Sequence, residues 1–196
     1  ADRYGYKFQE NAPYEIEYND SISAAEIERI HNAEEALDRF WNSGRFNRSM
    51  TYIMEHHIDA AYFEFFESIY NYYTSQNFPR FGYQLEDLFK VLSDYLATLN
   101  IDVFPLLRAD YYDNYTLKPH GFWNDKVEKK QKKAWLQEII HNDEFLTKNK
   151  LNPSQIEKFA TIDPINEETL LITLFNCRAS KIEPHPTVEY KLQEKS

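Results

Sequence analysis

Glycine and cysteine are scarce in this sequence, and both absences exclude classes of function. Four glycines among 196 residues are too few and too scattered for a glycine-rich phosphate loop, and the G-x-S-x-G, P-loop and dinucleotide fingerprints do not occur. The single cysteine, Cys177, excludes an internal disulfide framework and any iron–sulfur cluster held by three or four thiolates of this chain. A reducing compartment suits such a chain, so the cytoplasm is the expected location.

Long apolar runs and an excess of basic residues are also missing. No apolar run approaches the roughly 20 residues that a membrane-spanning helix requires, and the N-terminus lacks the pattern of a signal peptide. The formal net charge is -10, whereas a nucleic-acid surface needs clustered lysine and arginine. We therefore expect neither a membrane span nor a nucleic-acid partner. The chain begins with Ala1 rather than methionine, which we interpret as a C-terminal fragment of a longer protein.

Aromatic residues, in contrast, are abundant, with 15 Tyr and 14 Phe in the chain. Large rings bury much area per residue, and few glycines leave little room for tight turns, so this composition favours packed helices over an all-β fold. The sequence predicts a mainly α single domain over residues 1–196, with about six packed helices and a small antiparallel β element near the C-terminus. We expect an N-terminal segment over 1–20, a helical core over 21–160 and the β element over 161–196.

The stretch from Ser23 to His57 gives the clearest local prediction. Ser23 and Glu26 have the spacing of a capping box, so a helix should begin at Ala24. Gly44 is expected to end it in the left-handed conformation, after which a second helix starts at once and packs back to back with the first. The apolar residues that recur at intervals of three and four, and so should form the buried face of the first helix, are Ile27, Ile30, Ala33, Leu37, Phe40 and Trp41.

Three more helices are expected before residue 120. Asp59 is the predicted cap of the third helix, which is aromatic on most of its circumference and therefore lies either in the middle of the core or against a partner. A fourth helix covers about 84–99, and Pro105 suits the first turn of a fifth.

The rest of the chain changes character twice. Lysines crowd the amphipathic segment over 124–148, where a solvent-exposed face is expected and a membrane surface or an acidic partner is the alternative. Asn152 can start one further helical turn, and strands are expected over 169–177 and 188–192. In the first of these strands the Cys177 thiol should be an inert part of the core.

Several ionisable side chains are candidates for metal binding or acid–base catalysis. His56 and His57 are adjacent, which places them about 100 degrees apart on a helix and makes one shared metal ion unfavourable. The pairs Glu64–Glu67 and Asp110–Asp113 would do acid–base work only if burial drove their pKa values apart, and hydrated surface positions are the expectation.

Arginines are the remaining candidates. Arginine presents a planar fork that suits carboxylates and phosphates, so Arg45, Arg48 and Arg108 are candidates for binding an anion. The alternative is that they pair with the many acidic residues of this chain.

Four short motifs carry a resemblance to a known family. They are Pro13-Tyr14-Glu15, Phe40-Trp41-Asn42-Ser43-Gly44-Arg45-Phe46, Phe63-Glu64-Phe65-Phe66 and Leu106-Leu107-Arg108-Ala109-Asp110-Tyr111. Over roughly residues 3–192 the chain resembles the helical C-terminal domain, of unassigned function, that follows the catalytic barrel in cobalamin-binding radical SAM proteins. These proteins are similar to the anaerobic magnesium-protoporphyrin IX monomethyl ester oxidative cyclase.

The resemblance implies that the reactive parts lie upstream in a longer protein. An S-adenosylmethionine barrel with a 4Fe-4S cluster and a cobalamin-binding domain would be the partners of this segment. The parent would then be an oxidoreductase, whereas the segment alone would be no enzyme and would hold no catalytic, cofactor-binding or metal-binding residue.

The expected role is therefore that of a non-catalytic accessory domain that packs on the barrel and shapes substrate access. Arg45, Arg108 and Tyr111 are the candidate contacts to a substrate or to a neighbouring domain. A helical interaction module that recruits a redox partner or a second subunit is the alternative, and an independent hydrolase or metalloenzyme is a third hypothesis.

Overall fold

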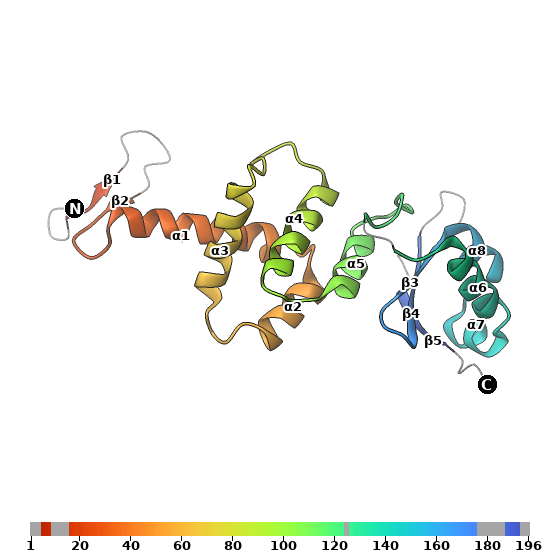
Figure 1. Ribbon diagram of the computed structural model, residues 1–196. Helices are drawn as coiled ribbons and strands as arrows, with labels where there is room; N and C mark the ends of the chain where they lie inside the picture. The colour runs from red at the N-terminus through yellow and green to blue at the C-terminus, as the bar shows by residue number, and fades with distance from the viewer. Residues whose placement is uncertain (1–4, 9–15, 124–125, 176–186, 193–196) are drawn as a thin grey trace.

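The computed structural model describes residues 5–8, 16–123, 126–175 and 187–192 (Figure 1). It is 56% helical, with eight α-helices and a three-stranded antiparallel sheet near the C-terminus. The predicted mainly α class is therefore confirmed. The helices outnumber the predicted six in part because the lysine-rich segment forms two of them. No helix in the described parts of the chain is long and apolar enough to cross a membrane.

The first helix starts where the sequence predicts. In α1 (Ala24–Leu37) the Ser23 hydroxyl accepts a hydrogen bond from the Glu26 N–H, and the Glu26 carboxylate accepts one from the Ser23 N–H. The helix runs on into a π-helical turn, η1 (Asp38–Asn42). Gly44 then adopts a φ of +67°, as the left-handed cap requires.

Four helices follow and complete the first part of the molecule: α2 (Asn47–His56), α3 (Tyr62–Ser75), α4 (Leu85–Thr98) and α5 (Phe104–Asp113). Pro105 lies in the first turn of α5, as predicted. The predicted cap at Asp59 is wrong, because α3 begins only after Ala60, whose φ is +57°. The predicted back-to-back packing of the first two helices is also wrong. Aromatic α3 takes the flank of α1, and α2 packs on α5 instead.

The C-terminal part places three short helices on a sheet. The helices are α6 (Lys129–Ile140), α7 (Asp143–Asn149) and α8 (Pro153–Phe159), and the strands are β3 (Ala160–Pro164), β4 (Thr169–Leu174) and β5 (Thr187–Lys191). Ile172 of β4 pairs antiparallel with both Ile162 and Val188. The antiparallel pair predicted over 169–177 and 188–192 is confirmed where the structure describes it, whereas Cys177 lies outside the described residues. The sequence reasoning missed β3.

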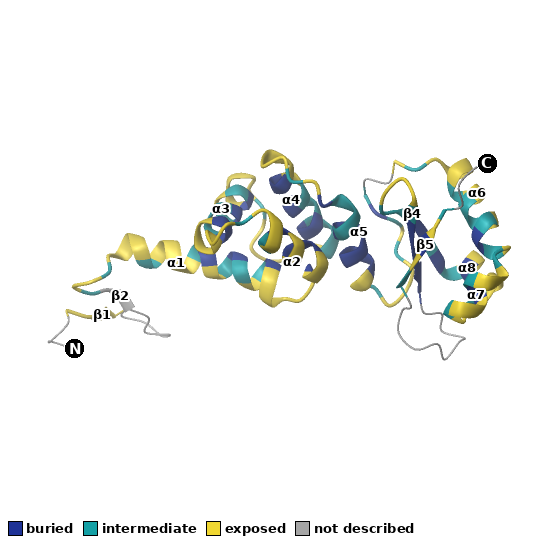
Figure 2. Ribbon diagram, turned by 90° about the horizontal axis from the view of Figure 1, so that it is seen from below, coloured by how far each residue is buried: buried dark blue, intermediate teal, exposed yellow. Residues whose placement is uncertain are grey.

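A second, smaller sheet precedes α1. Strands β1 (Lys7–Phe8) and β2 (Ile16–Tyr18) pair antiparallel, so the strand predicted near Tyr18 is present. Together with the first half of α1, this hairpin extends away from the other helices (Figures 1 and 2).

The buried side chains form two separate clusters. One belongs to the helical lobe, defined here as residues 24–123, and half of its members are aromatic, including Phe46, Phe89 and Tyr111. The other belongs to the C-terminal lobe, defined as residues 126–175 and 187–192. It is aliphatic except for Tyr190. Phe175 follows β4 directly but packs in the helical cluster, and it therefore links the two lobes.

The first helix departs from the predicted burial pattern in the first half of α1 and in η1. Ile30 and Trp41 were expected in the core, yet they are 44% and 43% exposed. The buried residues of α1 are Ala33 and Ala36, in its second half. The prediction that the aromatic helix α3 lies in the core is confirmed for Phe65, Phe66, Ile69 and Tyr73, which are buried, whereas Tyr62 and Phe63 at its start are exposed.

Candidate functional site

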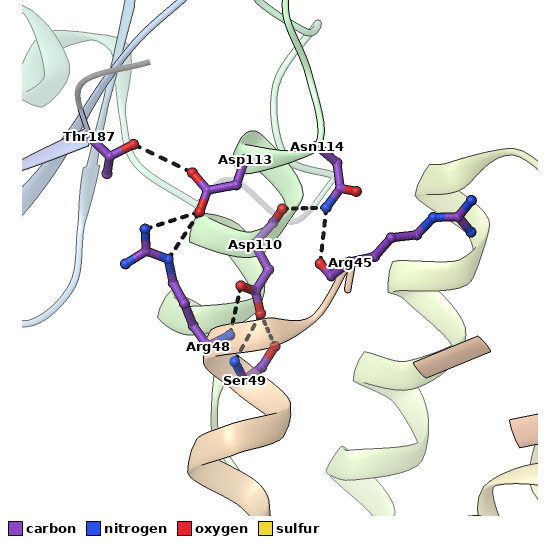
Figure 3. Close-up of polar contacts among 7 residues, drawn as sticks. All are labelled: Arg45, Arg48, Ser49, Asp110, Asp113, Asn114 and Thr187. Atoms are coloured by element: carbon purple, nitrogen blue, oxygen red, sulfur yellow. Dashed lines mark hydrogen bonds and ion pairs between the residues drawn. The ribbon is translucent and has the colours of Figure 1, made fainter. Parts of the chain in front are cut away.

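The structure does not gather the three predicted contact residues into one site. Arg45 lies on the exposed turn before α2, and its side chain points away from Asp110 (Figure 3). Arg108 and Tyr111 both lie on α5 and are buried. The Tyr111 ring packs edge-on against Phe89, with ring centroids 5.4 Å apart. Burial raises the pKa of Tyr111 strongly, so this phenol stays neutral and acts as part of the core.

The two motifs named above, the one around Gly44 and the one on α5, meet at a polar junction. Asp110 of α5 is 2% exposed, and its carboxylate accepts hydrogen bonds from the backbone N–H groups of Arg48 and Ser49 at 3.0 and 2.9 Å (Figure 3). The Ser49 hydroxyl donates to the same carboxylate. These N–H groups belong to the first turn of α2, where they have no partner within the helix. Asp110 of α5 therefore caps α2, a role that no side chain of the preceding turn fills.

The polar groups around Asp110 form hydrogen bonds and an ion pair within the chain. Asn114 donates to the backbone carbonyls of Arg45 and Asp110 at 3.0 and 2.8 Å, which ties the turn before α2 to the end of α5. Arg48 pairs with Asp113 through Nε and Nη2 at 3.1 and 3.0 Å, and the Thr187 hydroxyl lies 3.5 Å from the other Asp113 oxygen (Figure 3). We call these residues the α2–α5 junction.

The predicted hydrated pair Asp110–Asp113 is thus wrong for its first member. Burial raises the pKa of Asp110, against the opposing effect of its hydrogen bonds to Ser49 and Arg48. The two carboxylates face different partners, so they do not form the paired acid and base that such chemistry needs. The arrangement serves to hold two helices together.

Arg108 marks a second polar region, between α5 and the sheet. It is 5% exposed, and its guanidinium lies 5.3 Å from the ring centroids of both Phe104 and Phe122. Its Nη1 is 3.6 Å from Asp163 of β3, which is longer than a hydrogen bond. The ammonium group of Lys132 in α6 also donates a hydrogen bond to Asp163, at 3.2 Å. We call this contact zone between the two lobes the seam.

The expectation that the arginines pair with acids of this chain is confirmed for Arg48 and Arg108. Sequence reasoning did not find Asp163. The available signal was a lone acidic residue between Ile162 and Pro164 in a mostly apolar stretch, and this signal is weak without knowledge of the strand. Lys132 was seen only as one of several lysines, of which it is the half-buried one that reaches the seam.

Comparison with known families matches residues 2–188 to the family described as "Protein of unknown function (DUF4080)". The chain belongs to this family. The DUF4080 match spans both lobes and therefore includes the α2–α5 junction and the seam. No curated protein and no solved structure matches the chain.

Two of the remaining ionisable candidates of this DUF4080 chain, His56 and Glu67, have local partners. His56 stacks on Tyr52 with ring centroids 4.3 Å apart, and its Nδ1 lies 2.9 Å from the Tyr52 carbonyl oxygen. Glu67 pairs with Arg29 of α1. Within the described residues, no three histidine, cysteine, aspartate or glutamate side chains come together in a way that could hold a metal ion.

Proposed function

We propose that this DUF4080 chain is a non-catalytic accessory domain that packs on the barrel of a cobalamin-dependent radical SAM enzyme and shapes access to its substrate. The motifs quoted above support the link to that enzyme class. The observation that carries the packing role is the exposure of three large apolar side chains, one on α1 and two at the start of α3. They are Ile30, Tyr62 and Phe63, which we call the ridge, and their exposed fractions are 44%, 51% and 38%. Arg29, next to Ile30, lies over the Phe63 ring, which places the two segments beside each other.

The ridge is expected to pack against a partner, because short helices depend on packing for their stability. A helix as short as α1 gains most of its stability from packing an apolar face, since isolated helices of this length are marginal in water. Yet the start of α1 projects from the lobe (Figures 1 and 2), and Arg29 contacts Glu67 and Phe63 of α3 only through its guanidinium. No residue of α1 before Ala33 is buried. A neighbouring domain seated on Ile30, Tyr62 and Phe63 would supply the missing contact.

The α2–α5 junction supports the non-catalytic part of the proposal. Asn42–Phe46, the most specific of the resembling motifs, and Leu106–Tyr111 both lie there. The hydrogen-bonding groups of Asp110 and Asn114 are used to cap α2 and to fix its preceding turn. Two of the four resembling motifs thus lie where side chains hold the fold together, which supports a structural role for them.

The cofactors of the proposed parent would be held elsewhere. A 4Fe-4S cluster of the radical SAM kind takes three cysteines, and this chain has one. The cluster, S-adenosylmethionine and cobalamin are therefore assigned to the upstream barrel and cobalamin-binding domain, and the parent to the reducing cytoplasm.

The test uses the parent enzyme with the ridge made polar by the double substitution Ile30→Asp and Tyr62→Asp. We expect S-adenosylmethionine cleavage to continue while product formation falls about tenfold or more, because a displaced accessory domain leaves the substrate misplaced at an intact cluster. Phe81→Asp is the matched control. Phe81 is 81% exposed, more than any other large apolar residue that the structure describes, and it lies in a loop outside the ridge. Its product yield should equal that of the parent.

The alternative role gives a different pattern. If the chain recruits a redox partner or a second subunit, the ridge variant will turn over normally when a chemical reductant replaces that partner, and it will lose the partner in a pull-down assay. Equal loss of cleavage and product in the ridge variant would contradict the accessory role, because it would place the effect in the barrel itself.

A further inference from the structure

A cavity of about 450 Å³ opens at the seam beside Arg108, within the size range of small-molecule sites. Apolar residues from α5, from the segment before α6 and from the end of β3 form most of its wall. The wall includes Phe104, Arg108, Lys126, Val127, Pro164 and Ile165. We call this cavity the seam pocket.

The guanidinium of Arg108 is unusual for a buried group. It has five N–H donors, and buried donors of this kind are nearly always hydrogen-bonded. Among the described residues no acceptor reaches the buried Nε, and a carboxylate oxygen of Asp163 lies 3.6 Å from Nη1. Ring stacking against Phe104 and Phe122 holds the planar group in place without using its donors.

The charges around the seam pocket leave an excess of positive charge. Asp163 is shared between Arg108 and Lys132, and Lys126 adds a further cation at the wall. Asp102 is the carboxylate of the wall itself, and one of its oxygens accepts a hydrogen bond from the Phe104 N–H at 3.1 Å. Among the described residues of the wall itself, Arg108 and Lys126 therefore face one carboxylate, that of Asp102, which is engaged in capping α5.

We propose that the seam pocket binds a small organic carboxylate. The ligand's two oxygens take the N–H groups of Arg108, which forms planar two-point contacts with carboxylates, and Lys126 adds attraction at the rim. The apolar part of the ligand lies against Phe104, Val127 and Ile165. This combination selects against inorganic phosphate, which would leave those apolar side chains uncovered, and against neutral analogues, which cannot pair with the guanidinium.

Ligand binding in the seam pocket does not depend on the proposed accessory role. The seam pocket is formed by the chain's own two lobes, far along the chain from the α1–α3 ridge, so a ligand can bind whether or not a barrel covers Ile30 and Tyr62. The ridge experiment and the ligand experiment can therefore fail separately.

The test titrates the 196-residue chain with benzoate and with its neutral counterpart benzamide, up to about 10 mM, while methyl resonances are followed by NMR. We expect benzoate to shift the methyl signals of Val127 and Ile165 in a saturable manner and to leave those of Ile30 unmoved. Benzamide should bind about tenfold more weakly or worse, because hydrogen bonds to a charged group are the stronger kind. This comparison needs no variant, so it decides the matter even if a change at Arg108 impairs folding.

Substitutions of the cationic residues then show which of them binds the carboxylate of the ligand. Arg108→Gln should weaken benzoate binding about tenfold or more, and Lys126→Gln should weaken it by a smaller factor. Arg45→Gln, which removes an exposed arginine of the helical lobe, should leave the affinity unchanged. Equal binding of benzoate and benzamide, no shift at Val127 and Ile165, tighter binding of inorganic phosphate than of benzoate, or equal weakening by Arg45→Gln and a folded Arg108→Gln would each overturn the proposal.

Discussion

The two lobes solve the problem of burial with different materials. The helical lobe is filled with rings that meet edge-on or tilted, such as Phe89 against Tyr111 and Phe46, whereas the C-terminal lobe is filled with isoleucine and leucine between a sheet and three helices. Aromatic pairs add a directional preference to area burial. Branched aliphatic side chains fit the pleated face of a sheet. The aromatic and the aliphatic buried side chains are thus divided between two cores.

Buried polar groups differ between the α2–α5 junction and the seam. In the helical lobe Asp110 is fully used, since it accepts three hydrogen bonds from the first turn of α2. At the seam, the sheet face that meets α5 carries Thr161 and Thr173, directly opposite each other, and their buried hydroxyls have no partner among the described residues. Well-paired polar groups fix a structure, whereas unpaired ones indicate a place built for something else.

The largest effect is expected from emptying the aromatic core. Phe89→Ala should lower the free energy of unfolding of the helical lobe by about 3–5 kcal/mol, because Phe89 is fully buried and its ring contacts Phe46 and Tyr111. Denaturant titration followed by near-UV circular dichroism measures the loss. Phe81→Ala is the control and should stay within about 0.5 kcal/mol, since that ring is exposed.

Hydrogen exchange of the Phe89→Ala variant would sharpen the comparison. If the lobes are separate cooperative units, the amides of β4 keep their protection while those of α4 lose it. Equal loss in both lobes would contradict that view and would show that Phe175 and Arg108 couple the two cores into one.

The next largest effect concerns the helix cap. Asp110→Ala should destabilise the chain by about 1–3 kcal/mol, because it leaves the N–H groups of Arg48 and Ser49 without an acceptor in a buried place. Thermal and denaturant unfolding measure this loss. Asp113→Ala, one turn along α5, removes an ion pair at the surface and should cost less than about 1 kcal/mol. A larger loss from Asp113 than from Asp110 would overturn the assignment of the cap.

A smaller effect is expected in the aliphatic core. Ile172→Val should cost about 0.5–1.5 kcal/mol, because it removes one methylene from a fully buried position at the centre of the sheet. Ile30→Val is the matched control at an exposed position and should be nearly neutral. The loss should appear in the exchange of β4 amides, and a loss confined to α4 would show that the two cores are not distinct.

Local signals in the sequence predicted much of this fold. The capping box at Ser23 and Glu26, the left-handed Gly44 and the proline at the start of α5 each depend on neighbours within a few residues. The prediction failed where a distant segment decides. Ile30 has the spacing of a core residue but lies in the part of α1 where no residue is buried.

The candidate sites were less accessible to prediction than the helices. Arg108 was named from its side-chain chemistry, yet its counter-ion Asp163 lies 55 residues further along, on a strand that was not predicted. Asp110 was placed at the surface because its spacing to Asp113 indicates one helical face, whereas the N-terminus of α2 covers it. Both errors concern contacts between segments that are distant in sequence, which periodicity does not report.

The smallest effect is a dependence on pH, and it tests whether Asp110 behaves as a buried acid or as an ordinary cap. Burial raises the pKa of Asp110 above its ordinary value of 3.8, so the folded chain binds this proton more readily than the unfolded chain does. The contribution of Asp110 to stability is then fully present below 3.8 and is lost as the pH rises through the raised pKa. Asp110→Asn does not titrate, so the free energy of unfolding of the unmodified chain should fall relative to this variant over that range. The measurement is denaturant unfolding of both proteins at a series of acid pH values. The opposite slope would mean that the hydrogen bonds from Ser49 and Arg48 outweigh burial.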